Sequence, residues 1–147
     1  MIKFGYPTVI LIFFLLTGCA MISTFDQTAY EHAVNAKVDT LALINKSSGN
    51  YSDNVAEIAK LNLELQKAYE YDKGRALNTK TTGNWELLLG EDPAKPDSGI
   101  FPKFLDRWKK KGSLRTGAVA ADAKNVSDAF DQIIKLESGK SHSAPTN

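Results

Sequence analysis

Apolar side chains recur every three or four residues along most of this chain, and this spacing constrains the fold more than any other feature. Three stretches carry it, at residues 24–46, 52–77 and 113–138. Residues three and four apart lie on one face of an α-helix, so each stretch predicts an amphipathic helix. No stretch alternates apolar and polar residues between turn dipeptides, as a half-buried strand does. The pattern therefore predicts an all-α bundle of three long helices.

The same spacing predicts which face of each helix is buried. Thr24 and Gln27 precede the first apolar stripe in the arrangement of a capping box. Leu63 lies off the second stripe, so we expect the second helix to be contacted from two sides and to be the central element. The three stripes are Tyr30, Val34, Val38, Leu41 and Ile44; Val55, Ile58, Leu61, Leu65, Ala68 and Tyr69; and Val119, Val126, Phe130, Ile133 and Glu137.

A segment between the second and third long helices breaks the pattern. We expect two short helices there, about 84–89 and 101–111, separated by a loop in which Pro93 and Pro96 prohibit a continuous helix. Four aromatic residues of this segment either plug one end or side of the bundle or line an apolar pocket for a small ligand. They are Trp85, Phe101, Phe104 and Trp108.

An apolar run precedes the only cysteine of the chain. Lys3 is followed by the eight apolar residues 9–16, which is the plan of a secretory signal peptide. Next comes Leu16-Thr17-Gly18-Cys19, an aliphatic residue, two small ones and the cysteine. This motif resembles the lipobox of bacterial lipoprotein precursors. The resemblance covers about the first 20 residues and implies cleavage before Cys19, a thioether from its sulfur to diacylglycerol and usually a further amide-linked acyl chain.

This resemblance sets expectations for domains and location. Residues 1–18 would be the signal peptide, residues 19–138 one helical domain anchored by lipid at Cys19, and residues 139–147 a disordered tail. Ala20 is not the aspartate that signals inner-membrane retention in enterobacterial members of the class, so in a Gram-negative envelope the periplasmic face of the outer membrane is favoured. The alternatives are an uncleaved membrane-spanning helix within the uncharged residues 4–25 and a buried structural cysteine.

The charges of the chain balance, which disfavours a nucleic-acid partner. Lys and Arg together number 18 and Asp and Glu 17, without the basic surplus that nucleic acid requires. One basic cluster is a candidate contact for lipid phosphates or an acidic partner. In the alternative interpretation its cations favour the C-terminal turn of a short helix and its tryptophan belongs to the core. The cluster is Arg107, Trp108, Lys109, Lys110, Lys111 and Arg115.

No spacing of ligand residues predicts a bound metal or cofactor. The two histidines, His32 and His142, lie far apart in the sequence and form no zinc motif. We expect His32 to be an exposed helix residue. Glu91, Asp92 and Asp97 share a Pro-rich loop but lack the oxygen ladder of an EF-hand, so a solvated loop is favoured over a calcium site.

No catalytic group can be assembled from the sequence either. Asp72 follows Tyr69 by three residues, and beside Arg75 it predicts a structural hydrogen-bonding cluster more strongly than a general base. No nucleophile, base and orienting residue occur together, so we do not expect an enzyme.

These features combine into one hypothesis for the function. The chain is a lipid-anchored cell-envelope lipoprotein whose non-catalytic helical domain acts in protein–protein interaction or envelope structure, with an envelope protein as its partner. Tethering would raise the effective concentration of the domain for that partner. The alternative is a periplasmic module that binds a small apolar ligand.

Overall fold

The computed structural model of the protein describes residues 22–91 and 98–142. Within these ranges the regular structure is helical throughout, and the prediction of an all-α fold is confirmed. Two short 3-10 helices, η1 and η2, connect the first two α-helices. The elements are α1 (Gln27–Asn45), η1 (Lys46–Ser48), η2 (Tyr51–Asn54), α2 (Val55–Lys73), α3 (Thr79–Leu89), α4 (Ile100–Lys111) and α5 (Thr116–Ser138).

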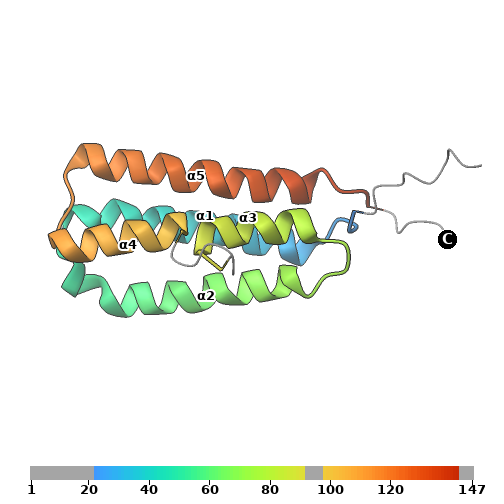
Figure 1. The fold of residues 1–147 in the computed structure, drawn as a ribbon, viewed down its shortest axis with the longest axis horizontal. Coiled ribbons are helices and arrows are strands. Elements are labelled where there is room, and N and C mark those ends of the chain that lie inside the picture. The colour runs from blue at the N-terminus through green and yellow to red at the C-terminus, as the bar shows by residue number, and fades with distance from the viewer. Residues whose placement is uncertain (1–21, 92–97, 143–147) are drawn as a thin grey trace, which may run out of the picture.

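The helices form a bundle, as predicted, and its rods run antiparallel (Figure 1). Helices α1, α2 and α5 run along the molecule, while α3 and α4 lie end to end and together form a fourth rod. Helix α1 packs against α2 and α5, and α3 packs against the same two neighbours. Successive rods therefore alternate in direction, the arrangement that short connections favour in a four-rod bundle.

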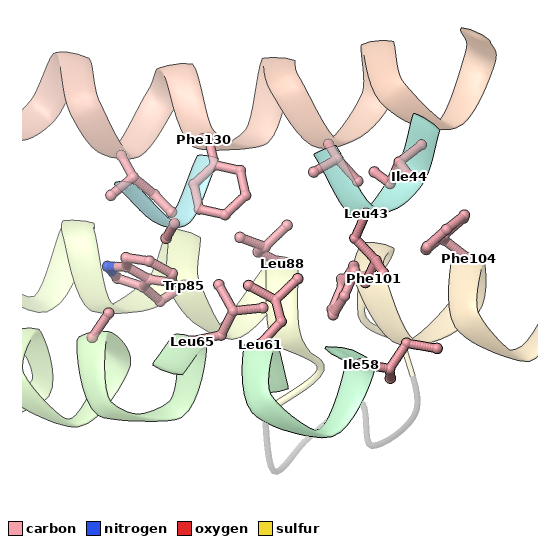
Figure 2. Packing of buried hydrophobic residues seen from close by; sticks show 14 of the residues in the cluster. Leu43, Ile44, Ile58, Leu61, Leu65, Trp85, Leu88, Phe101, Phe104 and Phe130 are labelled. Carbon is pink, nitrogen blue, oxygen red and sulfur yellow. The ribbon is translucent and has the colours of Figure 1, made fainter. Parts of the chain in front are cut away.

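Large apolar side chains from every rod fill the centre of the bundle (Figure 2). The indoles of Trp85 and Trp108 are both 0% exposed, and the Trp85 ring meets the edge of Phe130 with centroids 5.7 Å apart. The prediction that the aromatics of the broken segment fill the bundle is thus confirmed. Each such side chain contributes about 1.5–3 kcal/mol on burial, so this core is the main source of stability.

The sequence predicted the buried face of α1 only in part: Ile44 is buried and Leu41 packs against the core as predicted, but the buried positions before them lie beside the predicted stripe. Val38, assigned to the buried stripe, is 60% exposed, whereas Ala29, Ala33, Ala36 and Thr40 are buried. Small side chains on this face let α1 lie close to its neighbours, since the distance between helices depends on the side chains at the contact. The hydroxyl of Thr40 donates to the carbonyl of Ala36 at 2.7 Å, so its burial leaves no polar group unpaired.

The predicted start of α1 is also wrong. Asp26 is the N-cap, and its Oδ1 accepts a hydrogen bond from the amide of Ala29 at 2.9 Å. Thr24 lies outside the helix, where its carbonyl accepts a hydrogen bond from Arg75 at 2.6 Å. This long-range contact holds Thr24 outside the helix, so the capping box does not form.

Helix α2 presents a single face to the core. Ile58 and Leu65 are buried as predicted, but Leu63 is 57% exposed. The prediction of a central helix contacted from two sides is therefore wrong. Helix α2 packs mainly against α1 and α3 and keeps the Leu63 face in solvent.

Two glycine backbones touch where α3 meets α4. Gly90 ends α3 in the left-handed conformation, with φ of 80°, and its amide donates to the carbonyl of Glu86 at 2.8 Å. A Cβ on Gly99, the N-cap of α4, would lie 2.4 Å from the Gly90 nitrogen. The chain thus leaves the rod at Gly90 and rejoins it at Gly99; Pro93 and Pro96 lie outside the described residues.

Substituting Gly99 tests this contact between the two backbones. We expect Gly99→Ala to lower the free energy of unfolding by about 1–3 kcal/mol, because its methyl group would overlap Gly90. Gly83, inside α3, is the matched control: a Cβ there meets nothing within 4 Å, so Gly83→Ala should stabilise by about 0.5–1 kcal/mol. Urea denaturation followed by circular dichroism measures both changes, and equal effects would contradict the contact.

Candidate functional site

A set of buried and half-buried polar side chains lies at the end of the bundle where α1 begins and α5 ends (Figure 1). They come from the segment before α1, the end of α2, the turn before α3 and the end of α5. We name this set the polar clasp. Its members are Ser23, Asp26, Asp72, Arg75, Asn78, Glu137 and Lys140.

Asp72 is a carboxylate of the clasp and is 1% exposed. Its Oδ1 accepts hydrogen bonds from Arg75 at 3.1 Å and from the side-chain amide of Asn78 at 2.9 Å. Its Oδ2 accepts one from the indole N–H of Trp85 at 2.7 Å. The predicted structural cluster of Asp72 and Arg75 is confirmed. Tyr69, its third predicted member, instead donates to Glu86 at 3.3 Å, so that part is wrong.

Glu137, near the C-terminal end of α5, is also 1% exposed. Its Oε1 accepts from the backbone amide of Asp26 at 3.0 Å, and its Oε2 accepts from Arg75 at 2.9 Å and from Lys140. Arg75 therefore bridges two buried carboxylates, and it also binds the Thr24 carbonyl. One guanidinium, with several donors in a fixed plane, joins the end of α2 to α5 and to the segment before α1.

Asn78 connects the clasp to the beginning of the described chain. Its Oδ1 accepts from the hydroxyl of Ser23 at 3.0 Å and from Lys140. The amide of Ser23 also donates to the carbonyl of Leu77 at 3.1 Å. Ser23 is thus fixed through both its backbone and its side chain, and the bundle holds the chain from this residue onward.

The described residues after α5 pack against the same segment. The amide of Phe25 donates to the carbonyl of Ser141 at 2.8 Å, and the Phe25 ring stacks on His142 with centroids 4.4 Å apart. Lys140 is 7% exposed. Residues 139–142, which we assigned to a disordered tail, therefore belong to the folded end; residues 143–147 lie beyond the described part.

Opposite charges stabilise the ionised form of Asp26. Burial alone would raise its pKa, but hydrogen bonds from the Ala29 amide and the Tyr71 hydroxyl, with the charge of Arg75, hold the pKa below 3.8. Burial likewise opposes the charge of Arg75, yet its hydrogen bonds to Glu137 and Asp72 raise its pKa above the ordinary value. Asp26 and Arg75 are therefore both charged at neutral pH, where they help to bind the segments together.

The carboxylates of the clasp are occupied by hydrogen bonds within the fold. Both oxygens of Asp72 and both of Glu137 already accept hydrogen bonds, so neither side chain offers a free base. The depression beside it measures about 10 Å³, room for one water molecule. Among the described residues no group of three His, Cys, Asp or Glu is arranged to hold a metal ion.

The predicted basic cluster lies at the opposite end of the bundle, where α4 ends and α1 meets η1 (Figure 1). There the amide of Leu114 donates to the carbonyl of Ser47 at 2.8 Å. Trp108 belongs to the core, and its indole donates to the carbonyl of Gly49 at 3.0 Å. Arg107 pairs with Asp122 of α5. The exposed members are Lys109, Lys110, Lys111 and Arg115, and their contact with lipid or a partner stays a prediction.

Some of the other residues that the sequence singled out lie outside the described ranges. Cys19, the signal-peptide residues and the acidic pair Asp92 and Asp97 all lie there. Helices of the described ranges are too short or too polar to cross a membrane. His32, predicted to be exposed, is half-buried, with its ring against the edge of Tyr71 at 5.1 Å.

Sequence reasoning found part of the clasp and missed the rest. Asp72 and Arg75 are three residues apart, so their pairing was predictable, whereas Ser23, Asn78 and Lys140 meet only through the fold. One signal was present: Glu137 ends an otherwise apolar stripe, and a carboxylate at a core position requires a cation.

Comparisons with known proteins leave the site to be interpreted from its own chemistry. No protein-family model, curated protein or solved structure matches this chain.

Replacing Arg75 tests the bridge between the two buried carboxylates. We expect Arg75→Met to lower the free energy of unfolding by about 3–5 kcal/mol, because Asp72 and Glu137 would lose their shared cation. Lys124, in an exposed pair with Asp128, is the control, and Lys124→Met should change stability by less than about 1 kcal/mol. Chemical denaturation measures both variants, and similar losses would show that Arg75 does not act through its buried position.

The lowered pKa of Asp26 predicts an acid-sensitive contribution to stability. The folded pKa lies below the unfolded one, so ionised Asp26 stabilises the fold above about pH 4 and this contribution disappears as the pH falls through the folded pKa. Asp26→Asn keeps a capping oxygen but removes the charge. We expect the variant to be less stable than the parent at neutral pH and the difference to shrink as the pH falls through the folded pKa of Asp26. Thermal unfolding across pH measures this, and a constant difference would contradict it.

Proposed function

We propose that this chain is a lipid-anchored lipoprotein of the bacterial cell envelope. One observation carries the proposal: an uncharged apolar run ends in the lipobox Leu16-Thr17-Gly18-Cys19. In this interpretation the chain is exported, cleaved before Cys19 and acylated there. Two or three acyl chains make the attachment persistent, because one chain alone binds a bilayer only marginally.

We further propose that the helical domain is non-catalytic and acts through protein contacts or as a structural accessory of the envelope. The saturated hydrogen bonding of Asp72 and Glu137 supports a holding role for the clasp. The aromatic residues that suggested a pocket for a small ligand do not favour that second function, because Trp85 and Trp108 are fully buried. In a Gram-negative envelope the domain would face the periplasm from the outer membrane.

The role of the lipid in this proposal is to confine the domain to a surface. Confinement converts the meeting with a partner in the same layer into a nearly intramolecular event and raises the effective concentration. Weak contacts are then sufficient, so the partner surface needs no deep pocket. The exposed cations Lys109, Lys111 and Arg115 are candidate contacts for an acidic partner.

Acylation of Cys19 is the direct test of the proposal. In bacteria that express the full chain, we expect mass spectrometry to find a mature N-terminus at Cys19 carrying acyl chains, and fractionation to place the protein in the membrane. Cys19→Ser should abolish acylation, because only the thiol forms the thioether. Thr17→Ser, which keeps a small residue in the lipobox, is the matched control and should be processed like the parent.

Two results would contradict the lipoprotein proposal. One is a protein that retains Met1 in the membrane fraction, which would favour the uncleaved helix. The other is a Cys19→Ser variant that is processed and membrane-bound like the parent.

A further inference from the structure

We infer that the clasp end of the bundle faces the bilayer that carries the lipid, and that Ile22 and Leu77 insert into its interfacial layer. The inference rests on the proposed acylation of Cys19 and adds an orientation and a membrane-contact surface to it. The occupant of this surface is the phospholipid bilayer itself. Chain length, apolar exposure and backbone conformation carry the argument.

The chain between the anchor and the bundle is too short to hold them far apart. Cys19 precedes Ile22 by three residues, which span at most about 11 Å when fully extended. The bundle fixes the next residue, Ser23, through the Leu77 carbonyl and the Asn78 side chain. An acyl chain on Cys19 therefore brings this end of the bundle within about 11 Å of the bilayer surface.

Two large apolar side chains are exposed at this end. Ile22 is 42% exposed and Leu77 is 43% exposed, and both line the same shallow depression. Lys80 lies on the rim of that depression, where its ammonium can reach lipid phosphates while its methylene stem follows the apolar surface. Two aliphatic side chains beside a cation form a small surface that suits the boundary between headgroups and acyl chains.

The backbone of Leu77 supplies an independent observation. Its φ is 61°, in the left-handed region, and it is the one residue other than glycine with positive φ among those described. A branched aliphatic side chain adopts this conformation at a cost, which glycine or asparagine would reduce. Leu77 is also exposed, so its side chain contributes little to the stability of the fold. Insertion into a bilayer accounts for an exposed leucine at a position that disfavours it.

This orientation places the basic cluster away from the anchoring bilayer. Helix α1 separates the two ends and has 19 residues, about 28 Å at 1.5 Å per residue. Lys109, Lys111 and Arg115 then face outward and are available to a partner. A bundle that lay flat would instead bring its side or its basic end to the lipid, and the two arrangements differ in which residues touch acyl chains.

Tryptophan placed at three positions distinguishes these arrangements. The chain from Cys19 to Asn147 is coupled through its only thiol to a maleimide lipid in vesicles of phosphatidylethanolamine and phosphatidylglycerol. Each sample carries one substitution: Leu77→Trp at the clasp end, Leu87→Trp on the exposed face of α3, or Lys111→Trp at the basic end. Brominated acyl chains quench only a tryptophan close to them, and the native Trp85 and Trp108 are fully buried and give a constant background.

We expect binding to vesicles to blue-shift the added fluorescence of Leu77→Trp and brominated lipid to quench it, and we expect Leu87→Trp and Lys111→Trp to show neither change. Quenching of Lys111→Trp or Leu87→Trp, or none at position 77, would overturn the inference. Because the coupling is chemical, these outcomes do not depend on acylation in the cell. A failure here contradicts the orientation, whereas an unacylated Cys19 in bacteria contradicts the proposed function.

A second variant separates membrane insertion from folding. Asparagine tolerates the left-handed conformation, so Leu77→Asn should leave the melting temperature unchanged or higher. With a single-chain maleimide anchor, which binds marginally, the same variant should partition into vesicles about tenfold less well. Leu87 is 52% exposed and distant from the clasp, so Leu87→Asn should leave partitioning unchanged. Equal partitioning of Leu77→Asn and the parent would contradict insertion of Leu77.

Discussion

A single guanidinium joins residues near the beginning, the middle and the end of the described part of this protein. Arg75 lies between the carboxylates of Asp72 and Glu137 and also binds the carbonyl of Thr24. Without it, two nearly fully buried anions would depend on the weaker help of Lys140, Asn78 and neutral donors, a costly state in a medium of low dielectric. The termini of the bundle thereby become part of the fold.

The apolar core and the clasp contribute different things. Burial of Trp85, Phe130 and their neighbours supplies the larger free energy, but hydrophobic contact is not directional and allows helices to slide or repack. Hydrogen bonds of Asp72 and Glu137 have fixed partners and distances, so they specify how α2, α5 and the first described residues meet. Trp85 belongs to both the core and the clasp contacts, because its ring is buried in the core and its indole N–H donates a hydrogen bond to Asp72.

Sequence patterns predicted the features of this fold that depend on local spacing. The stripe of α5 was identified because Val126, Phe130 and Ile133 are large, apolar and helically spaced. The face of α1 was predicted correctly at Ile44 and wrongly at Val38, because Ala33 and Ala36 allow close packing and hydropathy gave the larger valines more weight than they carry.

The contacts of the candidate site likewise divide into those that local spacing predicts and those that only the fold creates. Asp72 and Arg75 are neighbours on one turn, so their contact follows from sequence spacing. Lys140 reaches Asn78 across 62 positions, and Ser23 reaches it across 55, distances at which no single-sequence pattern carries information. The N-cap was misassigned for a related reason, since Thr24 is bound by Arg75, which lies in the turn after α2 and 51 residues away in the sequence.

A short tether and the fixed position of Ser23 would limit how far a lipid-anchored domain can move from the bilayer. A domain on a long flexible linker can occupy a large volume beside the membrane, so its effective concentration for a partner falls as the linker lengthens. Under the proposed acylation of Cys19, three residues separate the lipid from Ser23, which the bundle holds through Asn78 and Leu77. The linker then adds little reach, and the length of the bundle sets the height at which Lys109 and Lys111 are presented. A partner would meet the basic end at a distance from the bilayer fixed mainly by the 19 residues of α1, so the geometry of the fold, and not the tether, selects where contact occurs.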